Sequence, residues 1–145
     1  MHFHIKSRAV PTRLATGAFI LHSGLEKWHA EPEHAAAVHG MAAGAFPMLK
    51  HLAPTRFVRL LAASEIAVGA ALLSPVVPNG VAGAALTGFS GSLLTMYWRT
   101  PALRRPGSMW PTSAGIGVSK DVWMLGIGLG LLIDGRGGRC QGPAT

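Results

Sequence analysis

The residues of this chain that could do chemistry are charged side chains set inside apolar stretches. Glu65 lies within one such stretch, Lys120 and Asp121 lie within another, and Lys27 closes the first apolar stretch of the chain. A charge in apolar surroundings is costly unless it is paired, so such residues turn inward and find partners. We interpret Glu65, Lys120, Asp121 and Lys27 as a candidate polar cluster. Two uses stay open for it: a polar pocket that handles protons, and a structural ion pair that fixes helix register.

Histidines are numerous, but their spacing is not typical of a metal site. Of the seven, four lie in one connection: His29, His34, His39 and His51. His34 and His39 are five residues apart, a spacing that does not place them well on one helix face. The single cysteine, Cys140, allows neither an internal disulfide nor a redox pair. Phosphate-binding, dinucleotide-binding and nucleophile motifs are absent too, and we expect no metal and no haem.

Four apolar stretches form the elements that must position the cluster. They cover residues 9–25, 57–74, 80–98 and 114–133, close to the ~20 residues that a helix needs to cross a bilayer. Between the first two, an Ala-rich segment at 33–49 is interrupted by Gly and Pro and is too short to cross. The sequence therefore predicts an all-α fold, an integral membrane four-helix bundle with an additional interfacial or re-entrant helix in the first connection. It forms a single domain over 1–145, with a mobile tail at 134–145.

The composition favours a membrane location. Apolar residues make up 49 % of the chain and charged residues only 13 %, whereas soluble domains have about 25 % charged residues. The net charge is +7, but the basic residues lie in short groups between the apolar stretches. That distribution is typical of membrane flanks beside anionic headgroups, and we expect no binding to nucleic acid.

The directions of the helices predict a partner for Glu65. In a chain of four antiparallel spans the second and fourth run the same way, so Glu65 and Lys120 should lie at comparable depth and face each other. Asp121 points about 100° away from Lys120, toward Lys27 or the interface. The opposite half of the bundle has only Arg13, whose long side chain should extend to the headgroups.

Small residues predict how the helices pack. Lipid supplies little hydrophobic drive for helix association, so close backbone approach matters. Small residues recur at every fourth position of the third stretch, and the fourth stretch has a GxxxG pair. The predicted packing residues are Gly80, Ala84, Gly88, Ser92, Gly126 and Gly130.

Three of the stretches contain short motifs: the run Arg13 to Gly17 followed by Gly24-Leu-Glu-Lys27, Glu65 followed by Gly69, and Lys120-Asp121. These motifs resemble the DoxX family of small four-helix membrane proteins, in its actinobacterial form. The resemblance covers roughly residues 13–134.

The resemblance implies a link to redox chemistry. DoxX-family proteins are similar to the membrane part of a thiosulfate:quinone oxidoreductase, and others are regarded as membrane partners of redox or oxidative-stress proteins. The cofactor stays open, with quinone as the candidate that this link implies. The residues that carry over are Gly24, Lys27, Glu65 and Lys120. The lack of a thiol pair argues against dithiol chemistry.

Three functions remain as hypotheses, and whether the chain is an enzyme stays open. The first is an accessory or anchor subunit of a membrane-associated redox assembly. The second is a quinone-handling oxidoreductase subunit with a pocket at Glu65. The third is a small-solute transporter, for which the chain shows no inverted repeat. The expected partners are the lipid bilayer and redox proteins, and the chain could also form an oligomer.

The basic residues predict an orientation. An even number of spans puts both termini on one side. Eight Lys and Arg residues lie in the first and third connections and five lie near the termini. The positive-inside rule then predicts a multi-pass protein of the cell membrane with both termini outside.

Overall fold

The chain is helical throughout the part that the structure describes, residues 7–137 of a computed structural model. The long helices are α1 (Val10–Trp28), α3 (Pro54–Leu73), α4 (Asn79–Arg99) and α6 (Asp121–Gly137). The shorter ones are η1 (Ser7–Ala9), α2 (Pro32–Ala45), η2 (Pro47–His51), η3 (Pro101–Leu103) and α5 (Ile116–Ser119). No strand occurs within residues 7–137. The all-α prediction is confirmed.

Prolines define where several helices begin. Pro11, Pro32 and Pro54 lie in the first turns of α1, α2 and α3, where a missing N–H costs nothing. At the other end, α6 continues through residues 134–137, which the sequence assigns to a mobile tail. It does so because Asp134 accepts hydrogen bonds from Arg8 and Asn79. The rest of the predicted tail lies outside the described residues.

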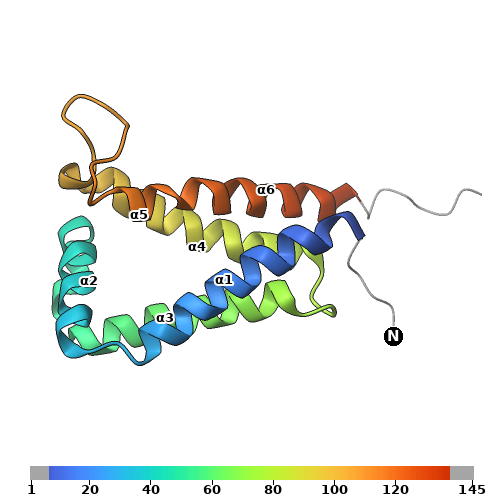
Figure 1. Ribbon diagram of the computed structural model, residues 1–145, viewed down its shortest axis with the longest axis horizontal. Coiled ribbons are helices and arrows are strands. Elements are labelled where there is room, and N and C mark those ends of the chain that lie inside the picture. Colours follow the sequence, from blue (N-terminus) through green and yellow to red (C-terminus); the bar gives the residue numbers. More distant parts are fainter. Residues whose placement is uncertain (1–6, 138–145) are drawn as a thin grey trace, which may run out of the picture.

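The long helices pack as two pairs, α1 with α3 and α4 with α6. Figure 1 shows the pairs meeting near the turn between α3 and α4 and diverging toward the other end. We call these the narrow end and the wide end. At the wide end α2 lies across the direction of the long helices.

Glycines bring α1 and α3 into direct backbone contact. A Cβ added at Gly17 would lie 2.9 Å from Leu72 Cβ, and one added at Gly69 would lie 2.7 Å from the backbone nitrogen of Leu21. These distances leave no room for a side chain. The two helices therefore approach closely through glycines along their interface.

In the α4–α6 pair glycines again allow direct backbone contact, but on a face of α4 that the sequence did not predict. A Cβ added at Gly83 would lie 2.7 Å from the carbonyl oxygen of Gly128. On the same face of α4, Ala82, Leu86 and Ser90 are buried. Gly128, between the two glycines of the predicted GxxxG pair, is the one that packs.

Most of the predicted packing residues lie on the outside. The exposed ones are Ala84, Gly88, Ser92, Gly126 and Gly130. Gly80 differs, because it lies against Gly135 of α6. The predicted face is wrong because α4 has small residues on two neighbouring faces, and a spacing of four does not tell them apart.

The helix predicted in the first connection at 33–49 is present as α2 followed by η2. His39 Nε2 lies 2.8 Å from the carbonyl oxygen of Leu49, and its ring meets Phe57 of α3 edge-on at 5.5 Å. Arg99, at the end of α4, lies over the ring of Phe46 at 5.1 Å. These contacts hold α2 and η2 against both helix pairs. With 14 residues, α2 is about 21 Å long, too short to cross a bilayer.

Arg13 holds the narrow end together from the inside. Its side chain is 1 % exposed and donates to Asn79 Oδ1 at 2.7 Å. It also donates to the carbonyl oxygens of Ala71, Leu72, Ser74 and Val77. Asn79 in turn donates to Asp134 of α6. The expectation that Arg13 extends to the headgroups is wrong, because the last carbonyls of α3 lack partners in their own helix and the planar guanidinium supplies them.

Much of the outside of the long helices is apolar, while several polar side chains are buried. The exposed apolar residues include Leu14, Leu60, Val81, Trp123, Leu129 and Ile133. The buried polar ones include Arg13, Glu65, Asn79, Ser90 and Asp121. Among the described residues, one helical segment, Ile116–Arg136, is long and apolar enough to cross a membrane, with a mean hydropathy of 1.6.

Candidate functional site

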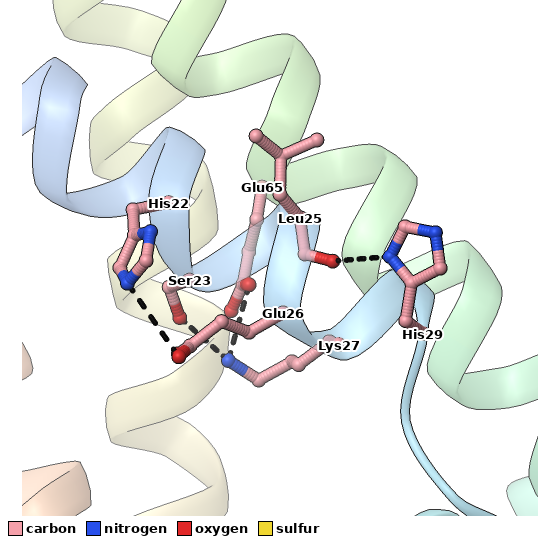
Figure 2. Close-up of polar contacts among 7 residues, drawn as sticks. All are labelled: His22, Ser23, Leu25, Glu26, Lys27, His29 and Glu65. Atoms are coloured by element: carbon pink, nitrogen blue, oxygen red, sulfur yellow. Dashed lines mark hydrogen bonds and ion pairs between the residues drawn. The ribbon is translucent and has the colours of Figure 1, made fainter.

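Lys27 and Glu65 form an ion pair between α1 and α3. Figure 2 shows Lys27 reaching across from α1, with its Nζ 3.1 Å from Glu65 Oε2 and 2.6 Å from Ser23 Oγ. The Glu65 side chain is 7 % exposed and that of Lys27 is 24 % exposed. A carboxylate so far from water is costly when alone, and the ammonium beside it offsets that cost.

The local sequence of α1 explains how Lys27 reaches its partner. Ser23 precedes Lys27 by four residues, so the two share a helix face. Gly24 lies against α3 at the level of the pair, and a Cβ added there would lie 2.9 Å from Glu65 Cβ. Because Gly24 has no side chain, the helices come close enough for the Lys27–Glu65 contact to form.

Asp121, at the start of α6, is buried near this pair. It is 7 % exposed and lies within electrostatic range of both Glu65 and Lys27. No residue in the range 7–137 forms a hydrogen bond or an ion pair with its side chain. The structure thus brings together Lys27, Glu65 and Asp121 from three helices.

Lys120 lies apart from this cluster. It is exposed and borders a surface groove with Trp98, Trp110 and Trp123. The predicted pairing of Glu65 with Lys120 is wrong, because Lys27 contacts Glu65 and because adjacent helical residues point about 100° apart. The face that α6 buries here is that of Asp121.

A cavity of about 370 Å³ lies between the two helix pairs, beside the ion pair. Its polar lining is Lys27, Glu65, Asp121 and Ser23. Aromatic and sulfur-containing side chains supply much of the rest, namely Phe19, Phe57, Phe89, Met41, Met96 and Met124. Its size and its few polar groups within an apolar wall are typical of a small-molecule site.

The polar lining determines what the cavity can bind. An ammonium has three N–H donors, and Lys27 uses two of them on Ser23 and Glu65. One donor of Lys27 and the carboxylate of Asp121 therefore remain for a ligand. With one cation and two acids, the site disfavours an anion and suits a neutral ligand that forms hydrogen bonds.

Other polar side chains near the pair are outside the cavity lining. His22 and Glu26 lie 3.5 Å apart, and both are exposed. His29 contacts the carbonyl oxygen of Leu25 (Figure 2). Within the described part of the chain, no group of three or more His, Cys, Asp or Glu residues could hold a metal ion.

Sequence reasoning missed the aromatic wall and Ser23. Phe19, Phe57 and Phe89 lie on three different helices, and no spacing in the sequence links them. Ser23 could have been found, since it precedes Lys27 by four residues on a helix that was expected.

Comparisons with known proteins give no match: no family model, no curated protein and no solved structure is similar to this chain. Any function therefore rests on the chemistry and geometry of the cavity.

Proposed function

We propose that this chain is an integral membrane protein whose four long helices cross the bilayer and whose cavity binds a lipid-soluble molecule of the quinone class. It would serve as a quinone-holding accessory subunit of a membrane-associated redox assembly.

The distribution of polarity supports the membrane location. Helices α1, α3 and α4 have 19, 20 and 21 residues, lengths of about 29–32 Å that suit a hydrocarbon layer of about 30 Å. Their exposed faces carry large apolar side chains, while α1 and α3 each bury a charged residue, Arg13 and Glu65, a distribution that is unusual for a soluble protein. Trp28 and Trp98 lie at the wide end beside basic residues, the pattern of an interfacial belt.

The ligand proposal is carried by the one N–H donor of Lys27 that no described residue accepts, in a cavity lined by phenylalanines. A quinone head is flat and has carbonyl oxygens that accept hydrogen bonds, and its isoprenoid tail is apolar. Phe19 lines the cavity and is also 69 % exposed, so the cavity reaches the outer surface of the bundle. A ligand dissolved in the bilayer could enter there.

The resemblance to the DoxX family supports the same class of ligand and a redox context. The proposed function combines the first two hypotheses, because the accessory subunit itself contains the quinone pocket. A transporter has less support, since no specific feature of the described helices favours it.

Saturable binding of decylubiquinone to the purified protein tests this function. Equilibrium dialysis in mild detergent should show binding to the wild-type chain. Ala42→Phe fills the cavity from α2, where Ala42 is part of the lining, and should weaken binding by about tenfold or more. Ala84→Phe adds the same bulk on the exposed face of α4 and should leave binding unchanged.

Circular dichroism of both variants verifies that the helices are intact. Absence of saturable binding, or equal binding by a folded Ala42→Phe variant, would refute the proposed function.

A further inference from the structure

Asp121 is a buried carboxylate that the described residues leave without a hydrogen bond. It is more than nine-tenths buried and it lines the cavity. Its carboxylate oxygens are not fully enclosed by protein atoms, and a carboxylate with so little exposure to solvent normally has a hydrogen-bond partner. An unpaired one in a cavity wall points to a ligand that supplies the donor.

The neighbouring cation does not fill that role. Lys27 donates to Glu65 at 3.1 Å and to Ser23 at 2.6 Å, on the α1–α3 side of the cavity. Asp121 belongs to the opposite helix pair. The cavity therefore has one remaining donor, at Lys27, on one side and an acceptor, Asp121, on the other.

We propose that Asp121 makes the cavity selective for the reduced, hydroquinone form of its ligand by accepting a hydrogen bond from a hydroquinone O–H. This inference rests on the proposed quinone site and adds the oxidation state that the site prefers.

The chemistry of the two oxidation states explains the preference. A quinone carbonyl oxygen has lone pairs and no hydrogen to donate, so the Asp121 carboxylate repels it. One hydroxyl of a hydroquinone donates a hydrogen bond to Asp121. The oxygen of the second hydroxyl, at the opposite end of the ring, still accepts a hydrogen bond from Lys27. Hydrogen bonds to charged groups are the stronger ones in proteins, and the carboxylate makes its bond in surroundings of low dielectric.

The test compares decylubiquinol with decylubiquinone on the full-length protein, by equilibrium dialysis under anaerobic conditions at pH 8. The reduced form should bind about tenfold more tightly than the oxidised form. A third probe, decylubiquinol methylated on both hydroxyls, has the reduced ring but no O–H donor. It should bind no better than decylubiquinone.

Asp121→Asn should remove the preference, mainly by weakening the binding of the reduced form. Glu26→Gln is the matched control, because Glu26 is an exposed acid whose ion-pair partner is His22, and it should keep the preference. Should Asp121→Asn fail to fold, the methylated probe still decides the matter on the wild-type protein.

The outcomes separate this inference from the proposed function. Three results would overturn the role of Asp121 and leave the quinone site standing. They are equal affinity for the two oxidation states, a preference that survives in folded Asp121→Asn, and binding of the methylated probe as tight as that of decylubiquinol. If neither oxidation state binds saturably, the proposed function falls, and this inference falls with it.

Discussion

At the scale of single residues, Lys27 contacts one carboxylate, that of Glu65, and has a second, Asp121, nearby. Loss of Lys27 leaves two buried acids without a cation. Loss of Glu65 leaves Lys27 with Ser23 as a hydrogen-bond partner and with the acid Asp121 still within electrostatic range. The two members of the ion pair should therefore contribute unequally to stability.

We predict that Lys27→Met lowers the free energy of unfolding by roughly 3–5 kcal/mol and that Glu65→Gln lowers it by less. Lys120→Met, at an exposed position, should change it by less than about 0.5 kcal/mol. Unfolding of the three variants in mild detergent, followed by circular dichroism, checks the order. A Lys120→Met variant as unstable as Lys27→Met would restore the pairing that the sequence suggested.

Arg13 gives a second prediction at this scale. Arg13→Lys keeps the charge but loses the planar fork that reaches several carbonyl oxygens at once. We expect a loss of about 3 kcal/mol, since buried acceptors are left unsatisfied. Arg56→Lys, at an exposed site near the start of α3, should cost almost nothing in the same unfolding experiment. Equal stability of the two variants would contradict a structural role for the Arg13 network.

At the scale of helices, the two faces of α4 predict effects of opposite sign. Gly83→Ala should destabilise the protein, because its Cβ would lie 2.7 Å from the carbonyl oxygen of Gly128. Gly88→Ala should stabilise it by up to about 1 kcal/mol, because no atom lies within 4 Å of the added Cβ and alanine favours helix over glycine. Thermal unfolding of the two variants distinguishes the faces. The reverse order would mean that α4 packs through the stripe at Gly80, Ala84, Gly88 and Ser92.

The existence of the helices could be predicted from the sequence, but the faces that they bury could not. The length of each apolar stretch is enough to indicate a helix. Which of two adjacent charges turns inward, Lys120 or Asp121, depends on a rotation of about 100° that packing against α4 decides. Arg13 was misplaced for a related reason, since its acceptors lie in α3 and the following turn, far from it in sequence.

At the scale of the whole molecule, the two helix pairs are joined at the narrow end and separated by the cavity at the wide end. The Arg13–Asn79–Asp134 network lies at the narrow end. The ion pair, the cavity and α2 lie toward the other end. The network that joins the helix pairs and the cavity that we propose as the ligand site thus lie at opposite ends of the bundle.

Our central proposal is that α1, α3, α4 and α6 cross a bilayer, with the turn after α3 on one side and the loop after α4 on the other. Two exposed residues report on those sides, Val76 in the turn and Met109 in the loop. The native thiol is first removed by Cys140→Ser. Val76→Cys and Met109→Cys are then made one at a time in that background.

Labelling of these single cysteines in intact cells with a membrane-impermeant thiol reagent is the most direct test. One of the two variants should be labelled in intact cells and the other only after lysis. The positive-inside rule predicts that the turn between α3 and α4 lies outside with the termini, so Val76→Cys should be the variant labelled in intact cells. Labelling of both variants in intact cells, or of neither until lysis, would contradict a bundle whose ends lie on opposite sides of a membrane.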